Sequence, residues 1–226
     1  MQRRRLPHFA SDAIASAGPI LSNALRRDYR TSAAPREMIG GTPLAGFIKA
    51  AIASALSNFP LTFLLVGLLF SAIAIARAAR PVGSALVVEK LLAWHVFWVI
   101  GVAFFYNFVM HAFFGRMAAA FIGWADSPFQ FEVATASLGF SVVGFLAAFR
   151  SFDLRLAAIV GAGLFTLGAA AGHVYQMATT HNFAPGNAGV IFYMDIFIPL
   201  FGFLLLWLQR RCEASRGGAP VQSRAE

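Results

Sequence analysis

Long apolar stretches separated by short polar ones fill the middle of this sequence. A helix needs about 20 mainly apolar residues to cross a bilayer. Five stretches approach or exceed that length, at approximately residues 59–76, 91–114, 131–149, 154–178 and 189–209. Pro199 lies inside the last stretch, where it predicts a kink because proline cannot donate the helical hydrogen bond. The pattern therefore predicts an all-α fold, a polytopic transmembrane helix bundle of about five spans.

A shorter apolar segment at residues 43–57 precedes the first span. Leu44, Phe47, Ile48 and Ile52 recur at helical spacing, but the segment is short and carries Lys49. Such a helix is expected to lie in the membrane interface as an amphipathic N-terminal helix. A sixth span over residues 40–57 is the alternative.

These segments define the expected organisation of the chain. Residues 1–42 are polar and rich in arginine, and we expect a disordered basic extension there. The interfacial helix follows at 43–57, the transmembrane bundle occupies 58–210, and a polar C-terminal tail covers 211–226.

Composition supports a membrane protein and excludes an ordinary soluble enzyme. Of the 226 residues, 58% are hydrophobic and only 12% are charged, whereas soluble domains carry about 25% charged residues. Cys212 is the single cysteine. An intramolecular disulfide and a thiolate metal centre are therefore excluded.

The net charge of +8 comes from the membrane edges and the tails. Residues 1–90 hold 11 Lys and Arg against 4 Asp and Glu, residues 91–209 hold 3 against 4, and residues 210–226 hold 4 against 2. No basic stripe interleaved with aromatic residues is present, so nucleic acid is not expected as a partner. Contact with anionic lipid headgroups, and thus the lipid bilayer as partner, is expected instead.

The loops indicate how the chain is oriented. Three Lys and Arg lie in the 77–90 loop, two in the 150–155 loop and four in the C-terminal tail, against one in the 115–130 loop and none in the 179–188 loop. Because positively charged loops stay in the cytoplasm, we expect the C-terminus to be cytoplasmic. Five spans then place the basic N-terminus outside, a conflict that a sixth span would remove.

Polar residues inside the predicted spans concentrate at one depth. His111 ends the second span, Glu132 begins the third, His173 and Gln176 lie near the end of the fourth, and Asp195 lies about two turns into the fifth. An up-and-down topology brings these ends to one side of the membrane. The supporting residues expected around this cluster are Arg116, Trp124, Asp126, Gln130 and Asn187.

Several chemistries fit this cluster. Imidazole and carboxylate ligands suit a metal ion such as zinc, iron or manganese, and His111 with His173 could be axial ligands of a haem. A proton-handling site and a site for an organic ligand also fit. The interpretation that the residues favour is a buried hydrogen-bond network joining the helices, since polar groups in hydrocarbon need partners.

Neither a GxSxG nor an HExxH motif occurs in the sequence, so an enzyme is not indicated. The first hypothesis is a non-enzymatic protein that binds a ligand or metal, or acts as a subunit, with a partner membrane subunit or a second copy as partner. Two alternatives are an oxidoreductase using iron, copper or haem at His111 and His173, and a small proton-coupled transporter using Glu132 and Asp195. Two smaller expectations are a pairing of His95 with Glu89 and an N-cap role for Asn187.

Three linked blocks resemble a family of small bacterial polytopic membrane proteins that is known as a domain of unknown function. The resemblance covers about residues 58–208 and implies a membrane fold but no activity. For the protein itself we expect the bacterial inner membrane. It singles out the same side of the bundle as the polar cluster. The matching residues are His111, Trp124, Ser127, Pro128, Phe129, Gln130 and Glu132, then Gly172, His173, Tyr175, Gln176 and Met177, and finally 182–187, Asp195 and Ile196.

Overall fold

The computed structural model describes residues 42–217, of which 42–47 belong to a first unit and 48–217 to a second. The expectations for residues 1–41 and for 218–226 lie outside the described residues. Helix α2 (Pro43–Ser57) has no buried residue, and Leu44, Phe47 and Ile52 are all exposed. At 15 residues α2 is shorter than a span, and its bounds are those expected from the sequence.

Five helical stretches are long and apolar enough to cross a membrane, as predicted. They are α3 (Phe59–Ala76), the continuous stretch α4 (Ser84–His95), η1 (Val96–Val102) and α5 (Ala103–Phe113), α7 (Phe129–Ala147), α8 (Phe152–Thr180), and α9 (Pro185–Ala188) followed by α10 (Val190–Gly217). Within residues 42–217 no strand occurs. The prediction of an all-α bundle with five spans is therefore confirmed.

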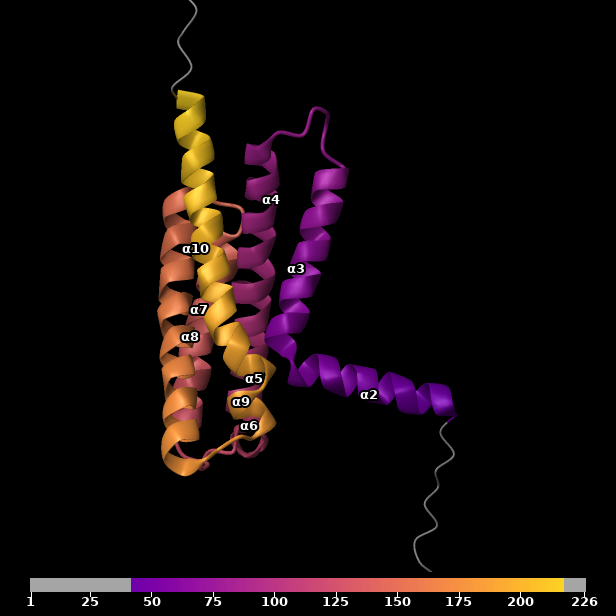
Figure 1. Ribbon diagram of the computed structural model, residues 1–226, viewed down its shortest axis with the longest axis vertical. Helices are drawn as coiled ribbons and strands as arrows, with labels where there is room; N and C mark the ends of the chain where they lie inside the picture. The colour runs from indigo at the N-terminus through magenta and orange to yellow at the C-terminus, as the bar shows by residue number, and fades with distance from the viewer. Residues whose placement is uncertain (1–41, 218–226) are drawn as a thin grey trace, which may run out of the picture. The chain divides into compact units, whose positions relative to one another are not determined.

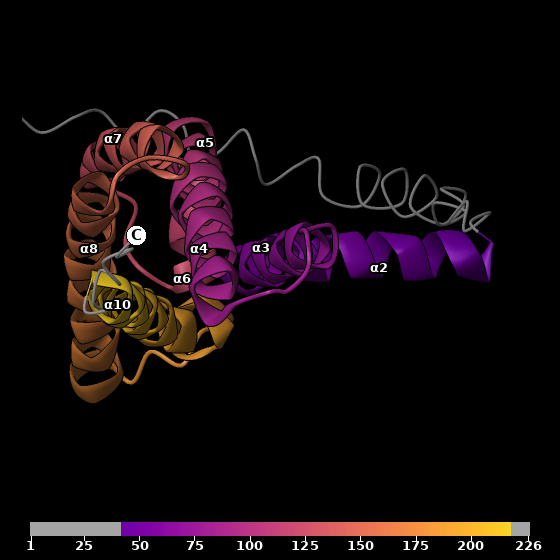
Figure 2. The ribbon, with the colours of Figure 1, turned by 90° about the horizontal axis from the view of Figure 1, so that it is seen from above.

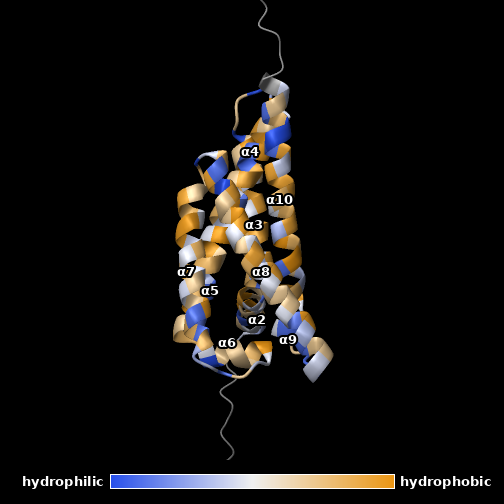
Figure 3. Ribbon diagram, turned by 90° about the vertical axis from the view of Figure 1, so that its left-hand side faces the viewer, coloured by the Kyte–Doolittle hydropathy of each residue, from blue (hydrophilic) through white to orange (hydrophobic). Residues whose placement is uncertain are grey.

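The spans run side by side along one direction (Figure 1). Seen end on, α4 and α5, α7, α8 and α10 surround a common centre, and α3 packs outside this ring against α4 and η1 (Figure 2). Hydrophobic residues dominate the middle of the helices, and hydrophilic ones gather mainly near their ends (Figure 3). This distribution fits helices whose outer faces meet lipid.

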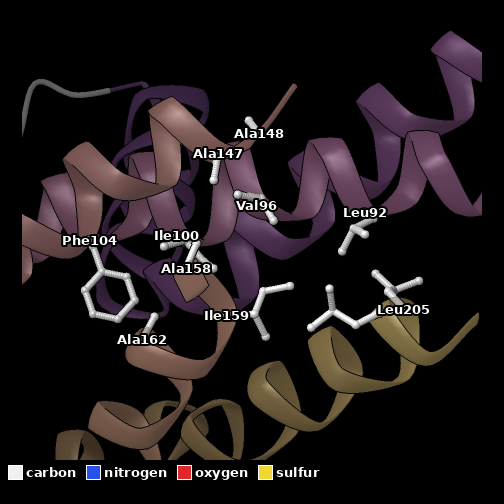
Figure 4. Close-up of a cluster of buried hydrophobic side chains, with 11 residues drawn as sticks. Leu92, Val96, Ile100, Phe104, Ala147, Ala148, Ala158, Ile159, Ala162 and Leu205 are labelled. Atoms are coloured by element: carbon white, nitrogen blue, oxygen red, sulfur yellow. The ribbon is translucent and has the colours of Figure 1, made fainter. Parts of the chain in front are cut away.

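The core of the bundle lies between the second span, the end of α7, α8 and α10 (Figure 4). Leu92, Val96, Ile100 and Phe104 follow one another at intervals of four residues, so they form one apolar stripe. Helix α7 comes close to this stripe because Gly144 faces the backbone of η1: a Cβ built on Gly144 would stand 2.6 Å from the Gly101 nitrogen. Small residues allow such close approach between membrane helices.

The second span begins seven residues earlier than hydropathy predicts, at Ser84. The added turns contain Glu89, which forms a two-pronged ion pair with Arg155 of α8 at 2.6 and 2.8 Å. Arg155 is buried, although the sequence places it among loop charges. The expected pairing of His95 with Glu89 is wrong, because Arg155 occupies the Glu89 carboxylate.

Two short helices, α6 (Gly115–Ile122) and α9, lie at the end of the bundle opposite the C-terminus of α10 (Figure 1). Helix α6 ends at Gly123, whose φ of 77° favours glycine. We call this the loop end, and the opposite end, which carries Arg77, Arg80, Arg150 and Arg210, the basic end.

Candidate functional site

A large cavity opens inside the loop half of the bundle. Its volume is about 1050 Å³, and its lining comes from the end of α2 and from α3, η1, α5, α6, α7, α8 and α10, with residues next to them. Most lining side chains are apolar. The polar ones are Ser57, Tyr106, Asn107, His111, Trp124, Ser127, Gln130, Thr166, His173 and Asp195.

One polar wall of the cavity is organised by Asn187. This residue is fully buried in α9, and its Oδ1 accepts hydrogen bonds from Trp124 Nε1 at 2.8 Å and from His173 Nδ1 at 2.7 Å. Its Nδ2 donates to the carbonyls of Asn182 at 2.9 Å and His173 at 3.3 Å. Asn187 thus joins α8, α9 and the segment after α6, and it is not the N-cap that the sequence suggested.

The same wall carries the pair of His173 and Asp195. His173 Nε2 lies 3.5 Å from Asp195 Oδ2. Because Asn187 Oδ1 can only accept, His173 Nδ1 carries a proton and Nε2 faces the carboxylate. Without a proton between them, the lone pairs of His173 Nε2 and Asp195 Oδ2 would repel each other. The pair is therefore stable when one further proton lies between these two atoms. With that proton, the two side chains together carry no net charge.

The loop segments that hold this wall are tied together by Asn182. Its Nδ2 donates to the carbonyls of Ile122 at 3.0 Å and Gly123 at 3.1 Å, and its Oδ1 accepts from the Ala184 amide at 3.0 Å. The chain reaches Asn182 through His181, which adopts a left-handed conformation with φ of 52°. The turn chemistry of the segment after α8 therefore positions Trp124 and Asn187 against His173.

The opposite polar wall lies on α5 and α7. His111 Nδ1 contacts Gln130 Oε1 at 2.5 Å, and Asn107, one turn before His111, donates to Ser137 Oγ at 2.9 Å. Gln130 Oε1 can only accept, so His111 Nδ1 carries the proton. The Nε2 atom has no protein partner among residues 42–217, and its lone pair is available to a donor in the cavity.

Of the ten predicted site residues, His111, Trp124, Gln130, His173 and Asp195 line the cavity, and Asn187 holds two of them in place. The structure does not bring the other four to it. Gln176 accepts a hydrogen bond from Thr180 on its own helix. Glu132, Arg116 and Asp126 are exposed.

The sequence analysis did not identify Asn107, Tyr106, Thr166 or Asn182 as site residues. Asn107 could have been found, because it lies one turn before His111 on the same face of a helix. Asn182 lies in the block 182–187 that the family resemblance singles out, but its contacts depend on how two loops meet, which the sequence does not show.

The arrangement bears on the metal interpretation. Among residues 42–217, no group of three or more His, Cys, Asp and Glu side chains is placed to hold a metal ion. His111 and His173 line one cavity, but each has a protein partner on Nδ1 and they belong to different walls. What the site offers is a set of hydrogen-bonding groups around a mostly apolar space.

The sequence pattern of a family of unknown function, DUF6790, matches residues 57–215. That range begins just before α3 and ends near the end of α10, so it contains every span and all of the cavity lining except Ala53 and Leu56. Searches of curated proteins and of solved structures return no match. The chain, a helical membrane bundle with five candidate spans, therefore belongs to the DUF6790 family of unknown function.

Proposed function

We propose that this protein binds a neutral amphiphilic molecule inside the membrane, in the cavity of the loop half. The observation that carries the proposal is a cavity of about 1050 Å³ with mostly apolar walls and two histidine-bearing polar walls. A large apolar pocket with a few converging polar groups is the usual form of a small-molecule site. Its volume is at the upper end of the roughly 300–1,000 Å³ range of ligand pockets.

The charge of the lining favours a neutral ligand. Among residues 42–217, neither lysine nor arginine lines the cavity, so none of them would balance a phosphate or carboxylate headgroup. Asp195 is the one acidic residue that this part of the chain contributes to the lining, and it is matched by His173. A charge placed in such a low-dielectric site without a partner would be costly. We infer that hydroxyl or carbonyl groups, rather than ionic ones, form the polar part of the ligand.

The polar groups that would contact the ligand differ between the two walls. On α5 the free Nε2 of His111 accepts a hydrogen bond, so it suits a ligand hydroxyl. On α8 and α10, the proton between His173 and Asp195 can be shared with a ligand oxygen. The apolar part of the ligand would then lie against side chains such as Phe104, Leu164 and Ile198, where burial contributes about 25 cal/mol per Å².

A photolabelling experiment tests this function. The purified protein, in vesicles of neutral lipid, is illuminated with a long-chain alcohol carrying a diazirine, and labelled peptides are mapped by mass spectrometry. A fatty acid with the same chain and diazirine is the charged comparison. We expect saturable labelling of α5, α8 and α10 by the alcohol, reduced by excess unlabelled alcohol, and weaker labelling by the acid.

Two glycines provide a matched pair of variants. Nothing lies within 4 Å of a Cβ built on Gly168 or on Gly139, so both positions accept a larger side chain. Both glycines are exposed, but Gly168 on α8 lines the cavity and Gly139 on α7 does not. We expect Gly168→Phe to reduce saturable labelling and Gly139→Phe to leave it unchanged. Equal labelling of both variants, or unsaturable labelling spread over all helices, would refute the proposal.

We further propose that the protein lies in the bacterial inner membrane with its basic end in the cytoplasm. The support is the distribution of Lys and Arg, which favours the cytoplasm for the end bearing Arg77, Arg80 and Arg150. The cavity would then lie in the outer half of the bilayer. The oxidoreductase and transporter hypotheses stay predictions from the sequence, and metal analysis with a visible spectrum of the purified protein tests the first of them.

A further inference from the structure

A buried histidine outside the polar walls lacks a hydrogen-bond partner. His95, the last residue of α4, is 4% exposed, and its Nδ1 has no partner among residues 42–217. On the side of α10 it meets the edge-on ring of Phe201, with centroids 5.4 Å apart, and the backbone at Gly202. Buried polar atoms are rarely left unsatisfied, because the loss of hydration is costly. The orphan nitrogen therefore points to a partner that the protein itself does not supply.

A second, small cavity lies beside this ring. It has a volume of about 10 Å³, which is roughly what one water molecule needs. Ile100, Phe104 and Ile159 form much of its lining, and an entirely apolar cavity of this size would stay dry. Besides His95, the lining includes Thr166, which carries a hydroxyl, and Pro199, which interrupts the backbone hydrogen bonding of α10.

Both features can bind water. Thr166 Oγ1 donates its proton to the Gly163 carbonyl at 3.2 Å, which leaves its lone pairs free to accept. Pro199 has no amide proton, so the Asp195 carbonyl, one turn earlier on α10, lacks its usual helical donor. In membrane helices, ordered water is one of the groups that satisfy a carbonyl freed by proline.

We propose that this small cavity is a hydration site in which one water molecule bridges His95 to α10. The water donates to Thr166 Oγ1 and to the Asp195 carbonyl, and it forms its third hydrogen bond with His95 Nδ1. Three partners are the usual number for a buried water. The site follows directly on the π-helical segment η1, and such segments are frequent at functional sites.

The hydration site adjoins the large cavity. Phe104, Thr166 and Ile198 line both spaces, and Asp195 and His173 line the larger one. The water therefore lies next to the large cavity, whose lining also includes the His173–Asp195 pair.

The water donates both of its protons, so the hydrogen bond with His95 is one that the water accepts. His95 Nδ1 therefore carries a proton and donates it to the water. The proposal goes beyond ligand binding, because it joins α4, α8 and α10 through one buried water.

Water-edited solid-state NMR of the wild-type protein in lipid vesicles tests the proposal directly. Labelling Trp with ¹³C at the carbonyl and His with ¹⁵N assigns His95, because Trp94–His95 is the one Trp–His pair in the sequence. We expect water magnetisation to reach the His95 ring much faster than it reaches dry core side chains such as Leu92. A His95 ring as dry as Leu92 would overturn the proposal.

Variants at two threonines separate this water from general access of solvent. Thr166→Val removes one partner of the water and should slow the transfer to His95, whereas Thr166→Ser keeps the hydroxyl and should preserve it. Thr135→Val, on the exposed face of α7, is the control and should have no effect. A Thr166→Val protein with unchanged transfer would contradict the proposed site. Because no amphiphile is added, this result is independent of the photolabelling.

Discussion

Asn187 gives the sharpest test of how the polar wall is held. Its replacement by alanine removes two hydrogen bonds accepted by Oδ1 and two donated by Nδ2 at once. The consequences differ between the partners. Trp124 is 36% exposed, so its indole N–H can turn to water, whereas His173 is 4% exposed and its Nδ1–H would be left unsatisfied.

The expected loss of stability follows from these exposures. An unsatisfied buried donor costs about 1–3 kcal/mol, and an ordinary hydrogen bond contributes about 0.5–1.5 kcal/mol. We therefore expect Asn187→Ala to lower the free energy of unfolding by about 3 kcal/mol, most of it from His173 and the carbonyls of the loop. For a chain of this size that corresponds to a fall in Tm of roughly 6–12 °C.

Thermal unfolding in detergent, followed by circular dichroism, measures this change. Asn58→Ala is the matched control, because Asn58 Nδ2 donates to the Ser54 carbonyl at an exposed site, where water replaces the lost bond. In a Trp124→Phe background the effect of Asn187→Ala should shrink, since one of the two donors is already gone. If Asn187→Ala lowered Tm no more than Asn58→Ala, the reasoning on the buried wall would be refuted.

Three further outcomes are expected. Glu89→Ala should lower the free energy of unfolding by about 3 kcal/mol, because it leaves the buried Arg155 cation without a partner. Arg155→Met should lower it less, and equal losses in chemical denaturation would contradict this. Gly144→Ala should cost about 1–3 kcal/mol because its Cβ would meet the η1 backbone, whereas Gly139→Ala should be neutral by the same measurement. Cys212 should react with a membrane-impermeant maleimide only after the cells are broken. Labelling of Cys212 in intact cells would show that the protein has the opposite orientation in the membrane.

The number of spans and their type could be read from the sequence. Hydropathy is a local property, and five apolar stretches separated by polar turns allow few other folds in a bilayer. The second span was predicted too short because Glu89 and Lys90 look like an interface. The turn that contains Glu89 is helical and packed because Glu89 forms an ion pair with Arg155, on a helix distant in sequence.

Depth in the membrane was also accessible from the sequence, but rotation about the helix axis was not. Gln130 and Glu132 lie at nearly the same depth, yet two residues along a helix turn the side chain by about 200°. Gln130 reaches His111, and Glu132 therefore faces outward. Sequence alone does not say which of the two points inward, because that depends on the neighbouring helix.

The sequence by itself determined that this protein is a helical membrane bundle with its polar residues gathered toward one end. The tertiary structure decided which of them meet: His111 with Gln130, and His173 with Asn187 and Asp195. It also decided that they border a cavity and that His95 Nδ1 has no hydrogen-bond partner within residues 42–217. The physical reason is that burial of apolar surface is set residue by residue, whereas hydrogen bonds between distant side chains require the helices to be packed at a particular rotation and separation.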